Sequence, residues 1–179
     1  MAEEERSRDW LISPRSSTSS GRSFNTPSRD STVHGTYPAG PGQGPLMPGK
    51  TFKIIERKSG RPITLLGNSL SLATATSQGG SAATDEWLCV ERNGYLGLQD
   101  PSSGRYLGHN GDSGVHAQAT EHKAWECLTT RDHPSGGYWL MTPDGEDALR
   151  VITVGEDGKS LVTRQHGKTL WAFVEVSDP

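Results

Sequence analysis

The sequence contains very little cysteine. Only two cysteines, Cys89 and Cys127, occur in 179 residues, and neither belongs to a Cys-x-x-Cys pair. Two isolated thiols cannot build a disulfide scaffold, and the ligand spacing of a zinc site is missing. We therefore expect a fold that is held together by its apolar core, with no metal and no cofactor.

An excess of positive charge is also missing. The formal net charge is −3 and the pI is about 6.1, so the chain has no overall basic surplus that would attract nucleic acid or an acidic membrane. The acidic start, Glu3–Glu5, lacks the apolar run of a signal peptide, and no later segment has the apolar length that spans a bilayer. We expect a cytoplasmic protein that binds neither nucleic acid nor membranes.

Hydrophobic residues make up only 31% of the chain, and they are unevenly spread. Residues 1–49 are rich in Ser, Pro, Gly and Arg, and such a segment cannot bury enough apolar surface to offset the entropy lost on ordering. From Phe52 onward, large apolar residues recur every few positions. We predict a disordered tail over residues 1–49 and one folded domain over residues 50–179.

The region after residue 50 repeats itself three times. Its three segments end alike, in Trp-x-[Cys/Phe] strings that begin at Trp87, Trp125 and Trp171. In each string apolar residues alternate with others, which is typical of a half-buried strand. Self-similarity of this kind indicates a fold built from repeated units.

Each segment also contains short strand candidates that are separated by turns. Gly, Asn and Asp occur at the reversals, and the string Ser59–Arg61 is echoed by Ser103–Arg105. Four strands per segment give twelve strands, and no stretch has a helical period. The strands predicted between the segment ends are 62–66, 69–74, 105–107, 115–119, 148–154 and 159–163.

Three four-stranded segments predict an all-β fold in which hairpins close a barrel, a β-trefoil. The pattern over residues 52–176 resembles the fascin-like branch of that superfamily, whose units open with Gly-x-Tyr-Leu strands and close on Trp-x-x-Phe or Trp-Glu-x-Phe strands. It departs from the ricin-type lectin branch, whose signature is Gln-x-Trp, since Asp85, Lys123 and Thr169 stand two residues before the tryptophans. The fascin-like resemblance implies a noncatalytic module that binds a protein such as actin.

The three repeated tryptophans are expected to line the core. A ligand site seldom recurs together with its buried alternation partner, so repetition favours three equivalent core positions over a sugar-stacking platform. Cys89 and Cys127 occupy the place of Phe173 in their segments. We therefore expect both cysteines to be buried thiols that fill core volume.

Three strings imitate functional motifs without their structural context. Residues 44–51 match the phosphate-binding pattern G-x-x-x-x-G-K-[ST], but two prolines remove amides and a strand is predicted next, not a helix. Residues 111–114, Gly-Asp-Ser-Gly, match a serine protease string but fall on a predicted turn. His109, His116 and His122 lack the spacing that aligns metal ligands. We predict no enzyme activity.

The best candidate for a ligand-binding loop runs from Tyr106 through His109, Asn110 and Asp112. It combines a ring for stacking with side chains that form hydrogen bonds, although the same residues are ordinary turn formers. Loops displayed on a rigid scaffold are a common place for binding sites. A carbohydrate-binding trefoil and a trefoil protease inhibitor are therefore the alternatives to a protein-binding module, and the expected partner is a protein such as actin, or a glycan.

Overall fold

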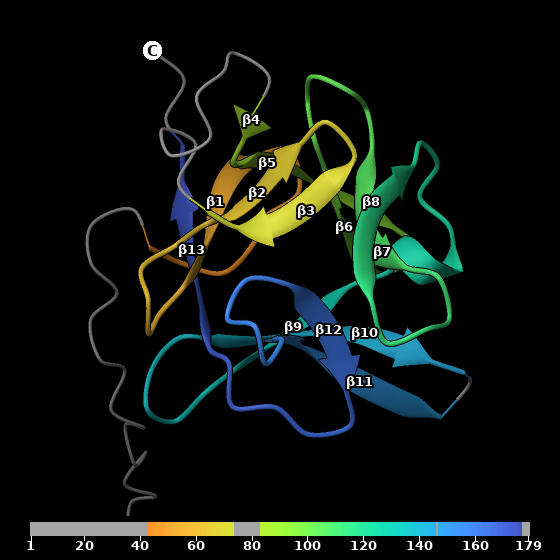
Figure 1. Ribbon diagram of the computed structural model, residues 1–179. Coiled ribbons are helices and arrows are strands. Elements are labelled where there is room, and N and C mark those ends of the chain that lie inside the picture. The colour runs from red at the N-terminus through yellow and green to blue at the C-terminus, as the bar shows by residue number, and fades with distance from the viewer. Residues whose placement is uncertain (1–42, 74–82, 146, 177–179) are drawn as a thin grey trace, which may run out of the picture. The chain divides into compact units, whose positions relative to one another are not determined.

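The computed structural model describes residues 43–73, 83–145 and 147–176, which form an all-β fold (Figure 1). Residues 1–42 of the predicted tail lie outside the described residues. Within the described part, no helix has the length and apolar character needed to cross a bilayer. The elements in chain order are β1 (Thr51–Glu56), β2 (Ile63–Leu66), β3 (Ser69–Leu72), β4 (Ala83–Thr84), β5 (Glu86–Arg92), β6 (Tyr95–Gln99), β7 (Tyr106–His109), β8 (Val115–Ala119), the 3-10 helix η2 (Ala124–Glu126), β9 (Thr129–Asp132), β10 (Tyr138–Asp144), β11 (Ala148–Val154), β12 (Leu161–Arg164) and β13 (Trp171–Glu175).

Six of the strands form a closed barrel. Antiparallel pairs join β1 to β5, β5 to β6, β9 to β10, β10 to β13, and β13 back to β1. Between β6 and β9, Leu96 and Leu128 exchange both backbone hydrogen bonds, at 2.9 and 2.7 Å. This last bridge closes the ring, so the barrel strands have neighbours on both sides and leave no long edge for aggregation.

Three hairpins, β2–β3, β7–β8 and β11–β12, complete the described part of the fold (Figure 1). Their second strands, β3, β8 and β12, contact one another. The Leu72 amide donates to the carbonyl of Lys159 at 2.8 Å, and the Thr163 amide donates to the carbonyl of Ser113 at 2.6 Å. Three units of two barrel strands and one hairpin make a β-trefoil, so the predicted fold is confirmed; the short β4, which pairs with β2, is an addition.

Two turns show how the repeated sequence specifies this fold. In the turn after β1, the carboxylate of Glu56 accepts the amide of Ser59 at 2.6 Å, and in the turn after β6, the carboxylate of Asp100 accepts the amide of Ser103 at 2.8 Å. Gly60 and Gly104 follow with φ of 70° and 71°, which only glycine adopts without strain. The same acid, serine and glycine pattern therefore builds the same reversal in two units.

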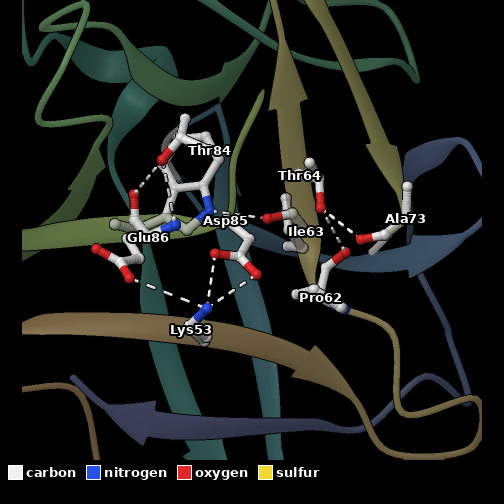
Figure 2. Close-up of polar contacts among 9 residues, drawn as sticks. Lys53, Pro62, Ile63, Thr64, Ala73, Thr84, Asp85 and Glu86 are labelled. Carbon is white, nitrogen blue, oxygen red and sulfur yellow. Dashed lines mark hydrogen bonds and ion pairs between the residues drawn. The ribbon is translucent and has the colours of Figure 1, made fainter. Parts of the chain in front are cut away.

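Trp87 and Trp171 lie in the core, as the repeat predicts. Both are fully buried, and their indole N–H groups donate to the carbonyls of Ile63 and Ile152, at 3.0 and 3.1 Å. Figure 2 shows polar contacts of the first unit, where the Lys53 ammonium on β1 lies 2.8 and 3.0 Å from the two carboxylate oxygens of Asp85. The largest fully buried side chains are Phe52, Ile54, Ile63, Leu72, Trp87, Leu98, Leu107, Leu128, Leu140, Ile152, Trp171 and Phe173.

The prediction for Trp125 is wrong, because this side chain is 51% exposed. In β5 and β13 the core tryptophan stands two residues before Cys89 and Phe173, which pair with the next barrel strand. The residue of β9 at the place of Cys89 and Phe173 is Thr130, so the matching core position is Leu128. Leu128 is fully buried, and Trp125 stands three residues before it on η2.

The prediction for the cysteines is half right. Cys89 is fully buried in the core. Cys127 is only partly buried, and its thiol donates to the carbonyl of Lys123 at 3.2 Å. The same three-residue offset explains the difference, because Thr130 holds the position that the prediction gave to Cys127.

The folded chain begins before the predicted boundary at residue 50. Gln43 pairs with Val174, and Leu46 is buried in the core. The Gly44 amide donates to Phe173 and the Gly49 amide donates to Cys89. The residues that match the phosphate-binding pattern therefore form backbone hydrogen bonds with the barrel, and they lead into strand β1.

Candidate functional site

Trp125 lies beside the β7–β8 turn, and the two together form the most distinctive exposed feature of the fold. Its ring centroid is 6.2 Å from that of His109, with the two rings tilted by 37°. A Cβ atom on Gly111 would lie 3.8 Å from Cζ2 of Trp125, so the indole lies close to the turn. We call Trp125, the turn residues His109–Asp112 and the adjoining segment Ala119–Glu126 the Trp125 surface.

Two buried features fix Trp125 in this exposed position. The Glu126 carboxylate, in a side chain only 6% exposed, accepts the backbone amide of Lys123 at 3.0 Å and so holds the short helix η2 in place. On β7, Gly108 lies under the Trp125 carbonyl, and a Cβ atom there would come within 2.7 Å of that oxygen. Only glycine leaves room for this approach, so β7 and η2 pack directly against each other.

A groove of about 550 Å³ runs along Ala119–Glu126, and Trp125 forms part of its wall. Glu121 and Lys123 form an exposed ion pair at its rim, with 2.7 Å between the carboxylate and the ammonium. The hydrogen bond and the charge of Lys123 lower the pKa of Glu121, so this carboxylate is ionised at neutral pH. The groove thus combines an aromatic face with charged hydrogen-bonding groups.

Three of the four residues predicted for the binding loop lie together next to Trp125. The Asp112 amide donates to the side-chain oxygen of Asn110 at 3.2 Å, and the Gly111 amide donates to Nδ1 of His109 at 3.2 Å. These bonds fix the turn, while the Asn110 and Asp112 side chains remain exposed. In the described part of the chain, the Asp112 carboxylate accepts no hydrogen bond.

Tyr106, the fourth predicted residue, has a different environment. Its ring stacks on His122, with centroids 5.5 Å apart and planes 19° apart, and not on Trp125. Burial and the charge of Arg92 lower the pKa of His122, although Glu126 opposes the shift, so the imidazole is neutral at pH 7. Tyr106 therefore belongs to a packed ring pair with His122.

The structure also gives the surroundings of the remaining motif candidates. Ser113, within the Gly-Asp-Ser-Gly string, accepts the backbone amide of Thr163 through its carbonyl and so links the β7–β8 and β11–β12 hairpins. The ring of His116 packs against Gly114. Over residues 43–73, 83–145 and 147–176, no cluster of three His, Cys, Asp or Glu side chains could hold a metal ion.

Sequence reasoning missed Trp125, Glu121 and Lys123 as site residues. The signal was present in the repeat spacing. Tryptophans 87, 125 and 171 are separated by 38 and 46 residues, whereas positions 87, 128 and 171 are separated by a more even 41 and 43. An even period would have placed Leu128 in the core and left Trp125 as an extra aromatic residue outside the repeat.

Comparisons with known proteins support this fold. The chain matches no family model and no curated protein sequence. Among solved structures it is similar to SeviL bound to asialo-GM1 saccharide, with a TM-score of 0.53, 14% identity, and coverage of 72% of this chain and 97% of SeviL. It is also similar to a Macrolepiota procera ricin B-like lectin in complex with lactose, with a TM-score of 0.55, 15% identity, and coverage of 75% and 100%.

A third similar structure is a GlcNAcα1-4Gal-releasing endo-β-galactosidase from Clostridium perfringens, with a TM-score of 0.59 and 14% identity. The match covers 72% of this chain but only 33% of that enzyme, so this chain corresponds to one part of it. These likenesses support the β-trefoil fold and do not single out the fascin-like branch. The chain is a β-trefoil whose match extends over nearly the whole length of two lectins.

Proposed function

We propose that this chain is a noncatalytic carbohydrate-binding module and that a sugar ring stacks on Trp125. The observation that carries the proposal is the half-exposed indole, since burying it in the core would have been the ordinary outcome for the largest apolar side chain. Tryptophan offers a flat apolar face to the C–H groups of a sugar, and nearby polar groups fix the hydroxyls. Asn110, Asp112 and Glu121 supply those polar groups.

The similar structures favour a glycan over a protein filament as ligand. Both lectins whose length this chain nearly spans are in complex with sugars, asialo-GM1 saccharide and lactose. The enzyme match covers only a third of the enzyme, so it gives no reason to propose catalysis. Actin binding, implied by the fascin-like resemblance, has no support from these structures, and the cytoplasmic location stays a prediction.

A glycan array followed by calorimetry tests the proposal. We expect binding of one or more galactose-containing glycans, and we expect Trp125→Ala to weaken it by at least about 30-fold, the loss of roughly 2 kcal/mol that a stacked aromatic anchor contributes. Tyr95→Ala is the matched control, because Tyr95 is also an exposed aromatic residue, at 40%, and lies outside the Trp125 surface.

A second variant and a second assay separate the alternatives. Asp112→Ala should weaken sugar binding without changing stability, since its carboxylate is exposed. Sedimentation with actin filaments tests the protein-binding alternative on the same preparation. The carbohydrate proposal would be overturned in favour of actin binding if the protein bound no glycan on the array but sedimented with actin filaments.

A further inference from the structure

A second groove lies where the first and third units meet, and cations dominate it. Its larger part, about 730 Å³, is lined by the β1–β2 turn, by Thr153–Gly155 at the end of β11, and by Lys168–Leu170 before β13. A smaller adjoining part adds Arg164 and His166. The groove shares no lining residue with the Trp125 surface.

Positive charge outweighs negative charge along this groove, although the whole chain is acidic. Five permanent cations line it, against the two carboxylates of Glu56 and Glu156. The Glu56 carboxylate is occupied, because it accepts the amides of Lys58 and Ser59 at 3.0 and 2.6 Å. Glu156 is exposed and lies 3.6 Å from Arg164. The cations are Arg57, Lys58, Arg61, Arg164 and Lys168.

Four of these cations lie within ion-pair distance of no carboxylate among the described residues, although the charge of Arg61 helps to lower the pKa of Glu56. Lys50, Lys53 and Lys123 each lie within ion-pair distance of a carboxylate. Arg57, Lys58, Arg61 and Lys168 do not, among residues 43–73, 83–145 and 147–176. The cluster therefore keeps positive charge that no ion pair within the described residues neutralises, and this charge is available for an anion.

Arg57 and Arg61 are held in place by hydrogen bonds to backbone carbonyls. The Arg61 guanidinium donates to the carbonyl of Gly158 at 2.6 Å and to that of Leu72 at 3.4 Å. The Arg57 guanidinium donates to the carbonyls of Ser135, at 3.3 Å, and Gly136. These bonds to neutral carbonyls limit side-chain motion without cancelling charge, which reduces the entropy lost when an anion binds.

We propose that this groove binds a tetrahedral oxyanion, the sulfate or phosphate ester group of a small ligand such as a sugar ester. Its oxygens accept hydrogen bonds from Lys58 and Lys168, while the fixed guanidinium groups supply charge. Sulfate and phosphate esters share this chemistry, and a neutral sugar lacks it. The site is independent of the Trp125 surface, so the failure of either proposal leaves the other untouched.

Backbone-amide NMR titration of the intact chain with glucose 6-phosphate, glucose 6-sulfate and glucose tests this proposal. We expect either ester to cause saturating shifts confined to residues 57–61, 153–158 and 164–170, and glucose to cause none there. If glucose 6-sulfate binds more tightly than glucose 6-phosphate, sulfate esters are the ligand class. If glucose 6-phosphate binds more tightly, phosphate esters are. Lys168→Gln should weaken ester binding about tenfold, the loss expected for one charge-assisted hydrogen bond.

The matched control is Arg131→Gln, which removes one exposed positive charge from β9, outside the groove. This variant should bind the esters as the unmodified chain does. The proposal is overturned if neither ester binds, if glucose causes the same shifts, or if Arg131→Gln weakens binding as much as Lys168→Gln.

Discussion

Trp87 and Trp171 occupy equivalent core positions in two of the three units. Each indole is fully buried and donates its N–H to a backbone carbonyl in the hairpin of its own unit. Leu128 fills the equivalent core position of the second unit, but its side chain has no hydrogen-bond donor. The core is therefore only approximately threefold, and the tryptophans contribute both packing and a buried hydrogen bond.

Stability measurements should separate the three tryptophans. Trp87→Ala or Trp171→Ala should lower the free energy of unfolding by about 3–5 kcal/mol, since each leaves a large cavity and an unpaired carbonyl. Trp125→Ala should change it by no more than about 0.5 kcal/mol, because that side chain is half exposed. Urea denaturation followed by circular dichroism checks this, and a loss of several kcal/mol in Trp125→Ala would contradict the exposed position.

The two thiols should differ in reactivity. Burial, together with the charge of Glu91, raises the pKa of Cys89 from 9.0 to about 11. Burial and the charge of Glu126 also raise the pKa of Cys127, but this thiol is partly exposed. At pH 8 a thiol reagent should label Cys127 in the native protein and Cys89 more than about tenfold more slowly. Labelling counted by mass spectrometry tests this, and Cys127→Ser should abolish the fast phase.

The same shift predicts the effect of alkaline pH on stability. The pKa of Cys89 is higher in the folded than in the unfolded chain, so its contribution is complete below pH 9.0 and is lost as the pH rises through about 11. The melting temperature should fall over that range, and less steeply in Cys89→Ala. Equal slopes in the two proteins would contradict the buried thiol.

At the scale of the structural element, carboxylates organise the turns after β1 and β6. Burial alone would raise the pKa of Asp100, but hydrogen bonds from Ser103 and Ser102 lower it, and its residue is only 1% exposed. Asp100→Asn should cost about 1–3 kcal/mol at pH 7, since it removes charge-assisted hydrogen bonds. The loss comes from one turn and not from the core.

At acidic pH, the difference in unfolding free energy between the unmodified chain and Asp100→Asn should disappear. Because the folded pKa of Asp100 lies below the ordinary value of 3.8, its stabilisation is present above that value and is lost as the pH falls below it. Urea midpoints of the two proteins should therefore converge between pH 4 and pH 2. Asp112→Asn, at an exposed carboxylate, serves as control and should follow the unmodified chain throughout.

The contact between β7 and η2 depends on one glycine. A Cβ atom at Gly108 would lie 2.7 Å from the Trp125 carbonyl and 3.1 Å from the Glu126 side chain. Gly108→Ala should therefore destabilise the fold by about 1–3 kcal/mol through overpacking, and it should displace η2. Gly44→Ala, where a Cβ atom meets nothing within 4 Å, is the matched control. Unchanged stability and unchanged Trp125 fluorescence in Gly108→Ala would show that η2 does not pack as described.

At the scale of the whole molecule, repetition made the fold predictable. The strands 115–119 and 148–154 were predicted with their observed bounds, because alternation and glycine-containing turns act locally. For Trp125, the uneven spacing of the repeat was the signal that the sequence offered, and no local pattern added to it. Tertiary contacts decide the position of this side chain, namely the buried Glu126 carboxylate and the close approach at Gly108, and neither leaves a local pattern in the sequence.

Only part of the candidate site could be predicted from the sequence. His109, Asn110 and Asp112 were included in the predicted loop because turn residues with polar side chains are recognisable, and the structure places this turn beside Trp125. Tyr106 was included because it is near them in sequence, but strand β7 turns its ring toward His122. The cationic groove was missed because its residues come from segments about 100 positions apart, which only the closed barrel brings together.

Hydrogen exchange of the indole N–H groups, followed by assigned ¹⁵N NMR, tests most directly whether the barrel buries two repeated tryptophans and leaves the third outside. We predict that the signals of Trp87 and Trp171 exchange only with global unfolding, whereas the Trp125 signal is lost within the first spectrum. Slow exchange at Trp125, comparable with that of Trp171, would contradict both the exposed position of this side chain and the sugar-binding surface built on it.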